Sequence, residues 1–196
     1  MLTTLNRIKS SDYLGDLSFE KLLRGLKKPK PDDDPVAITT ILEIIGLGGA
    51  FACMESVEGY DQEMRQYAVD CVRMMAPSLI DYERDEQRAV LLLDTIERYA
   101  FGNATDDELA VAADFDGSGP SKWPLDIASQ VRIEEPPCYA MRCTVGRMIW
   151  WAALGSDWKT EKRLADACSW LLALYCAEIE QREDAEAAAA PEEHQD

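Results

Sequence analysis

The sequence is almost devoid of histidine, since its one imidazole belongs to His194. A Ser-His-Asp or Cys-His catalytic site needs an imidazole that is held rigidly beside the nucleophile. The segment around His194, EDAEAAAAPEEHQD, is polar and acidic, so we expect it to be a frayed tail. Histidine-dependent general-base catalysis is therefore not expected.

Long apolar runs are also missing. The most apolar segment is interrupted by Glu43 and by a cluster of glycines, and a membrane-spanning helix needs about 20 predominantly apolar residues. The first residues, MLTTLNRIKSSDYLGDLSF, lack the apolar core of a signal peptide. We therefore expect a cytoplasmic protein (in the host cytoplasm if the gene is a phage gene) that has no membrane contact and whose cysteines are free and buried.

Metal and phosphate motifs are incomplete. Cys138 and Cys143 are the nearest cysteine pair, but a spacing of five places them about 140° apart on a helix, which does not suit zinc. The run from Asp114 to Gly119 resembles the start of an EF-hand loop, yet Leu125 stands where the final Glu ligand belongs. The GLGG motif lacks the Lys and Ser/Thr of a phosphate-binding loop. We expect no metal, no cofactor and no enzymatic activity.

Charge is abundant and strongly unbalanced. The chain has 37 acidic and 20 basic side chains, a net charge of −17. Residues 1–30 hold seven bases and three acids, so residues 31–196 carry a net charge of −21. Such a field repels nucleic acids and anionic membranes and attracts basic surfaces, although it can also serve solubility alone. The basic segment could contact an anionic partner, but we expect it to pair with the acidic body of its own chain.

Apolar residues recur at intervals of three and four through most of the chain, as they do on the buried face of a helix. This spacing predicts helices over about 61–77, 85–101, 138–154 and 157–182. Thr105 and Glu108 form a capping box before a further short helix. No segment alternates as strands do. We predict an all-α, single-domain bundle of about six or seven helices, with a long irregular loop near 114–137.

The N-terminal part has a different pattern. We expect residues 1–17 to be loosely ordered and Ser18 to cap a short helix. The breaker-rich stretch 27–35 indicates a linker, after which Asp34 can cap a helix that has Pro35 in its first position. The following glycines either break that helix or let another helix pack very close. The predicted organisation is a basic N-terminal arm and linker, a helical domain and a disordered acidic tail, over residues 1–34, 35–182 and 183–196.

Residues 66–113 contain an order of motifs that is found in a known family. A helix with a central Cys71 is followed by a short charged turn, by a helix that bears Arg88 and ends at Gly102, and by the alanine-rich helix that Thr105 caps. This order resembles the helical immunity proteins of polymorphic toxin systems in bacteria and phages. The resemblance implies a helical fold and a protein that neutralises a toxin by binding it, often with acidic surfaces against nucleases. It carries over no catalytic residue.

These observations predict an acidic inhibitor that binds a basic protein, such as a nuclease or another nucleic-acid-binding effector, and makes no direct contact with nucleic acid. Its role would be that of an immunity protein or of a phage anti-defence protein such as an anti-CRISPR, with carboxylates that mimic nucleic-acid phosphates. The predicted contact residues are acidic or aromatic: Asp81, Glu83, Asp85, Glu86, Asp106, Asp107, Asp114, Asp116, Glu134, Glu135, Trp123 and Trp151. The alternative is a structural or adaptor subunit that assembles through helical faces, as a homo-oligomer or with larger machinery.

Overall fold

The computed structural model describes residues 1–79, 82–113, 145–146, 149 and 158–189. In this part of the chain seven helices accompany one two-stranded sheet, which confirms the predicted helical fold class. The elements, in chain order, are β1 (Leu2–Thr4), α1 (Leu5–Ser11), α2 (Asp16–Gly25), β2 (Pro35–Ala37), α3 (Ile38–Met54), α4 (Asp61–Leu79), α5 (Tyr82–Ala100), α6 (Asp106–Ala113) and α9 (Trp158–Ala189).

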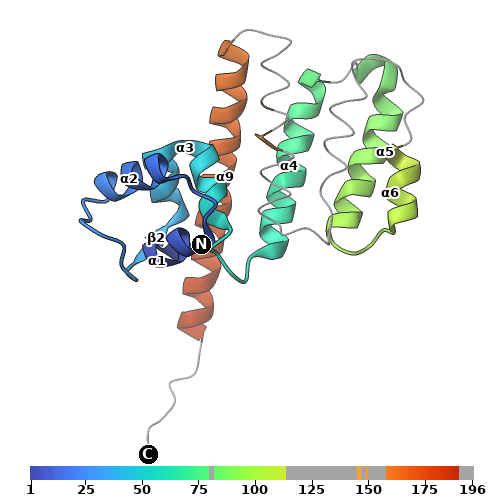
Figure 1. The fold of residues 1–196 in the computed structure, drawn as a ribbon. Coiled ribbons are helices and arrows are strands. Elements are labelled where there is room, and N and C mark those ends of the chain that lie inside the picture. The colour runs from blue at the N-terminus through green and yellow to red at the C-terminus, as the bar shows by residue number, and fades with distance from the viewer. Residues whose placement is uncertain (80–81, 114–144, 147–148, 150–157, 190–196) are drawn as a thin grey trace, which may run out of the picture.

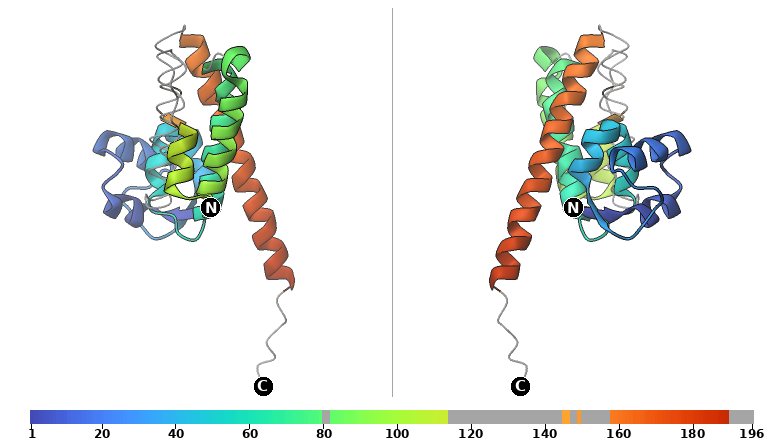
Figure 2. Two further views of the ribbon diagram at one scale, coloured as in Figure 1. Left: turned by 90° about the vertical axis from the view of Figure 1, so that its right-hand side faces the viewer. Right: turned by 90° about the vertical axis from the view of Figure 1, so that its left-hand side faces the viewer.

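The long helix α9 is the axis of the arrangement. Helix α3 packs on one side of α9 and α4 on the other, while α2 covers α3, and α5 and then α6 continue outward from α4 (Figure 1). With 32 residues, α9 is roughly 48 Å long. Its C-terminal turns extend past the other helices (Figure 2). Helix α9 therefore contacts both the N-terminal part, through α3, and the α4–α6 part, through α4.

An aromatic cluster joins the three central helices. The Tyr67 ring of α4 makes edge contacts with Phe51 of α3 and with Tyr175 of α9, at centroid distances of 6.0 and 5.8 Å. Both Tyr67 and Phe51 are buried, and the Tyr67 hydroxyl donates a hydrogen bond of 3.0 Å to the carbonyl oxygen of Cys168. A buried phenol needs such a partner, and this one fixes α4 against α9.

The expectation that residues 1–17 are loosely ordered is wrong. Strand β1 pairs with β2 in antiparallel fashion, and Leu5 and Ile8 of α1 are completely buried. The buried Thr3 hydroxyl lies 2.6 Å from the Ser56 hydroxyl, which ties β1 to the end of α3. Helix α2 also begins earlier than predicted, at Asp16 with Gly15 as its N-cap instead of Ser18. The N-terminal segment thus contributes side chains to the same core as the later helices.

The predicted start of the third helix is also wrong. Pro35 belongs to β2, opposite Thr4, and α3 begins only at Ile38. Proline is tolerated in such an edge strand, where its missing N–H is not needed. The sequence left two roles open for the glycine cluster, a break in the helix or the close approach of another helix. Gly46 breaks the helix, because its backbone angles (φ 78°, ψ 179°) are not helical and interrupt α3. Close packing occurs instead at Gly25, where a Cβ would meet Ile44 at 2.5 Å.

The middle helices follow the prediction closely. Helix α4 buries one face, formed by Met64, Tyr67, Ala68, Cys71, Val72 and Met75, and α5 buries Leu92, Leu93 and Ile96. The capping box is present, because the Glu108 amide donates to Thr105 Oγ1 at 3.2 Å and the Thr105 amide donates to Glu108 Oε2 at 2.8 Å. Of the predicted helix 138–154, residues 145, 146 and 149 are helical and the rest lies outside the described residues, as does the predicted loop 114–137.

The C-terminal helix is longer than predicted. We expected fraying after Arg182, but α9 continues to Ala189, and only residues 190–196 lie outside the description. The apolar residues Leu164, Cys168, Leu172 and Ile179 recur at helical spacing on α9 and are buried. None of the helices described is both long and apolar enough to cross a membrane.

Candidate partner-binding groove

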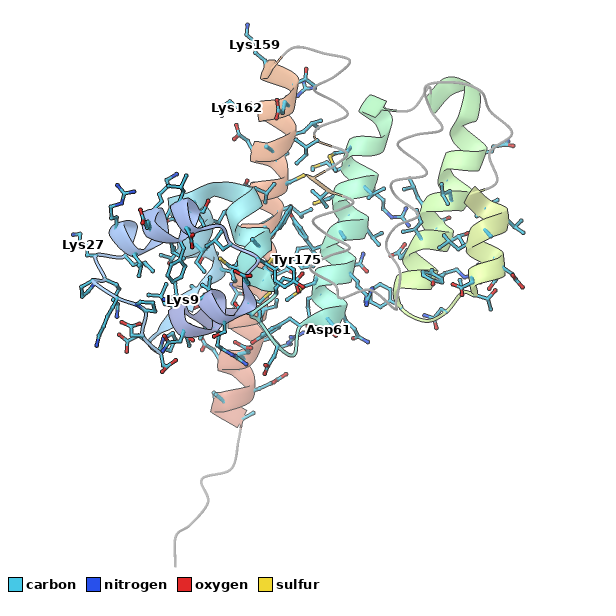
Figure 3. All side chains as sticks on the ribbon, viewed as in Figure 1. Lys9, Lys27, Asp61, Lys159, Lys162 and Tyr175 are labelled. Carbon is cyan, nitrogen blue, oxygen red and sulfur yellow. The ribbon has the colours of Figure 1, made fainter. Side chains whose placement is uncertain are left out.

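A groove of about 550 Å³ lies along α4 and α9. Its floor and walls come from residues at helical spacing on these two helices, with Phe101 at one end: Gln62, Glu63, Gln66 and Asp70 from α4, and Leu171, Leu174, Tyr175 and Glu178 from α9. Tyr175 lies between the two helices, and Asp61 marks the N-terminal end of α4 (Figure 3). Three carboxylates and two aromatic rings therefore line one surface.

Asp70 is the most strongly organised of these carboxylates. Its Oδ1 accepts a hydrogen bond of 3.0 Å from Gln66 Nε2, and its Oδ2 accepts one from the Tyr175 hydroxyl. Burial raises the pKa of Tyr175 above its ordinary value, and the hydrogen bond to Asp70 raises it further. Both donors are neutral, so the Asp70 carboxylate is oriented without being neutralised.

Contacts to the C-terminal half of α9 are made at the N-terminal end of α4. Arg182 Nη2 lies 2.7 Å from Glu63 Oε1, a carboxylate that lines the groove. One turn further, the Tyr60 hydroxyl donates to Glu183, and this bond raises the pKa of Tyr60 to about 12. Glu183 lies one residue beyond the predicted end of the last helix, within the part of α9 that continues to Ala189.

The groove keeps an excess of negative charge. Glu63 is paired with Arg182, whereas the described residues supply no ion pair to Asp70 or to Glu178. Glu178 is exposed and Asp70 is partly buried. A positive group that enters the groove would therefore find carboxylates that are free to pair with it.

An exposed aromatic residue stands beside the groove. Trp170 is 66% exposed, and Leu174, four residues later on the same face of α9, is 38% exposed and lines the groove. Large apolar side chains at an exposed position are a feature of protein-binding surfaces, where Trp is enriched among the residues that contribute most energy. Sequence reasoning missed Trp170, although its place opposite the inward positions Cys168 and Leu172 is visible from the helical spacing.

The predicted contact residues whose side chains the structure describes, Asp106 and Asp107, do not line this groove. Asp106 and Asp107 begin α6, where Asp106 Oδ1 accepts a hydrogen bond of 2.5 Å from the Tyr99 hydroxyl and stabilises the turn. Glu83, Asp85 and Glu86 belong to the first turns of α5, and their side chains are not described. The remaining predicted residues lie outside the described part: Asp81, Asp114, Asp116, Trp123, Glu134, Glu135 and Trp151.

A second, mainly apolar depression of about 310 Å³ lies between α5 and α6. Leu91 and Val111 line it and are 57% and 75% exposed. Arg98 borders it and pairs with Glu108 at 2.7 Å, which lowers the pKa of Glu108. Its described lining holds Asp107, Glu108 and Arg98, two acids and one base, whereas the described lining of the groove along α9 holds three acids and no base.

The described cysteines are free and buried, as the sequence predicted. Burial raises the pKa of the Cys53 thiol to about 12, and it also raises the pKa of Cys71 and Cys176. The thiolate is the form that attacks substrates and binds metals, so these thiols behave as core groups near neutral pH. Within the described ranges, no three or more His, Cys, Asp or Glu side chains are grouped so that they could hold a metal ion.

Comparison with protein-family models, with curated proteins and with solved structures finds no match. The resemblance of residues 66–113 to immunity proteins therefore stays a prediction. What can be argued about function depends on the groove itself.

Proposed function

We propose that this chain is an acidic helical inhibitor that binds a basic, nucleic-acid-handling protein through the groove along α4 and α9. The observation that supports this proposal is a groove that combines unneutralised carboxylates with exposed apolar side chains. Asp70 and Glu178 provide the charge, while Trp170 and Leu174 provide the apolar contact. Charge complementarity steers the encounter and selects the partner, and the apolar anchors contribute most of the affinity.

The same surface is compatible with two biological roles. An immunity protein would hold a toxin nuclease inactive, and a phage anti-defence protein would occupy the nucleic-acid channel of a defence effector. In both cases carboxylates of this chain take the place of phosphates on a Lys/Arg-rich surface. The net charge of −21 over residues 31–196 supports either role, because it adds long-range attraction to the local contacts of the groove.

A charge-matched pair of variants tests the proposal. The full-length protein, tagged, is used to capture its partner from the native host, and the purified pair is then titrated at low and high salt. We expect the groove variant E63Q/D70N/E178Q to bind at least about tenfold more weakly, and to lose much of the salt dependence, because exposed charges are screened over about 10 Å at 0.1 M salt. We also expect the unmodified chain to inhibit the nucleic-acid-processing activity of the captured protein.

The control variant E20Q/D33N/E43Q changes the net charge equally. Its three acids are exposed and lie on α2, on α3 and in the segment between them, on the other side of α9. We expect it to bind like the wild type within about twofold. Equal losses in both triple variants, or binding that is indifferent to salt, would contradict the proposal. Trp170→Ala, expected to weaken binding with no change in net charge, tests the apolar anchor separately.

The α5–α6 depression favours a second candidate function, that of an adaptor subunit that assembles through helical faces. The exposed Leu91 and Val111 would be covered in such an assembly. Sedimentation of the full chain distinguishes this candidate, since a stable oligomer that Val111→Asp dissociates would support it. A monomer at all concentrations, with partner binding unaffected by Val111→Asp, would reject it.

A further inference from the structure

We infer that the groove seats one arginine side chain of the partner, with its guanidinium on the carboxylate of Asp70. This inference rests on the proposed function, because it names the group that the basic partner presents. It starts from the hydrogen bonds of Asp70, whose two oxygens each accept one bond from a neutral donor, Gln66 Nε2 and the Tyr175 hydroxyl. Each oxygen keeps acceptor capacity, since an ionised carboxylate accepts about four hydrogen bonds.

The two donors fix the plane of the carboxylate. A guanidinium is planar and presents parallel N–H donors that match a carboxylate in two-point fashion, whereas the ammonium of lysine is a point charge on a flexible stem. A carboxylate whose orientation is already set loses little freedom when it accepts such a pair. The geometry around Asp70 therefore favours arginine over lysine.

The surroundings suit the rest of the side chain. Phe101 and Tyr175 supply aromatic surface in the same groove, and guanidinium groups bind against aromatic rings. Leu171 and Leu174 offer apolar contact to the methylene stem. Glu178, which has no ion pair among the residues described, adds a second negative charge at the edge of the site.

Among the described residues, no cation is paired with Asp70. Arg182 is engaged with Glu63, and Arg73, three residues after Asp70 on α4, is engaged with Asp94 and Glu97. Helices α1 and α2 lie on the opposite side of α9 from α4 (Figure 1). Two basic residues of the N-terminal segment also have partners, since Arg7 pairs with Glu58, and Lys28 with Asp32 and Asp34. An incoming guanidinium therefore does not have to displace any of the described cations from Asp70.

The test uses two small probes that differ in one charge. N-acetyl-arginine methylamide and its citrulline analogue, in which a neutral urea replaces the guanidinium, are titrated into the isotope-labelled full chain and followed by NMR. We expect the arginine probe to shift the Gln66 side-chain amide and the Tyr175 ring saturably and to bind about tenfold more tightly than the citrulline probe, which equals about 1.4 kcal/mol. Asp70→Asn should remove this difference, and Glu43→Gln, on α3, should leave it unchanged.

Glu178→Gln provides a second variant on an exposed position, in case Asp70→Asn disturbs the fold. Glu178→Gln should weaken binding of the arginine probe by a smaller factor than Asp70→Asn does, because the Asp70 carboxylate is still present. Equal binding of the two probes, shifts spread evenly over the acidic surface, or no binding at all would overturn the arginine seat. None of these results would decide the proposed function, which the captured partner and the two triple variants test independently.

Discussion

Replacing Leu22 and Leu17 by alanine, one at a time, tests whether the N-terminal segment belongs to the core. Both leucines lie on α2, five residues apart, but Leu22 is completely buried and Leu17 is 83% exposed. Removing a buried leucine side chain costs about 2–5 kcal/mol, from the lost transfer free energy and the cavity that remains. Removing an exposed one changes stability by no more than about 0.5 kcal/mol.

Leu22→Ala should lower the free energy of unfolding by an amount within this range of about 2–5 kcal/mol. Helix α2 lies so close to α3 that a Cβ on Gly25 would meet Ile44 at 2.5 Å, so the space left by Leu22→Ala has little room to collapse. Taking a loss of about 3 kcal/mol and a urea m-value of about 2 kcal/mol/M, the unfolding midpoint should fall by about 1.5 M. In a thermal scan the same loss lowers Tm by about 6–12 °C.

The assay is urea unfolding followed by circular dichroism and by tryptophan fluorescence. Because every Trp of the chain lies at position 123 or later, fluorescence reports on the C-terminal part. We expect Leu22→Ala to move both signals together, and Leu17→Ala to move neither. If Leu22→Ala produced a separate early transition in circular dichroism and left the fluorescence midpoint unchanged, residues 1–34 would be an independent arm and the shared core would be refuted.

Three further predictions concern single positions. Gly46→Ala should destabilise the protein by about 1–3 kcal/mol, measured by urea unfolding, because the backbone at φ 78° and ψ 179° is strained for any residue with a side chain; an unchanged midpoint would contradict the break in α3. Thr105→Ala should cost about 0.5–2 kcal/mol, since the Glu108 amide loses its cap, whereas Thr105→Ser should retain most of the stability. The pKa of Tyr60 is about 12 in the folded protein against an ordinary value of 10.0. The contribution of Tyr60 to the free energy of unfolding is therefore complete below pH 10 and is lost as the pH rises toward 12. Tyr60→Phe should make unfolding less dependent on pH in that window, and the same slope in both proteins would show that the bond to Glu183 is not formed in solution.

Local patterns predicted the middle of the fold well, and for physical reasons. Helix α4 has apolar residues at three- and four-residue spacing, and α6 has a cap whose two hydrogen bonds join residues three apart. Such features depend only on residues that are close together in the sequence. Residues 183–189 consist of Glu, Asp and Ala, and because Ala and Glu favour helices, this composition agrees with the helicity of α9 beyond Arg182.

Features that join distant residues could not be predicted. Strands β1 and β2 have three residues each, which is too short to show the apolar–polar alternation of a strand in the sequence. They form because the two segments, distant in the sequence, pair with each other with Leu2 opposite Ala37. The contact between Asp70 and Tyr175 joins residues 105 apart in the chain, and nothing near either residue indicates the other. The sequence therefore could not predict the groove, and of the predicted acids Asp106 and Asp107 belong to the first turn of α6, where Asp106 accepts a hydrogen bond from Tyr99.

The position of the charges gives the groove its significance. A basic N-terminal segment was expected to pair with the acidic body, and Arg7 does so with Glu58. The other basic side chains of α1 and α2 are exposed and form no ion pair among the residues described. Helices α1 and α2, which carry these cations, supply none of the described residues that line the groove, and they lie on the opposite side of α9 from α4 (Figure 1). Of the ion pairs among the described residues, only Arg182–Glu63 involves a carboxylate of the groove, so Asp70 and Glu178 remain available to an external cation, which is the property that a receptor for a basic surface requires.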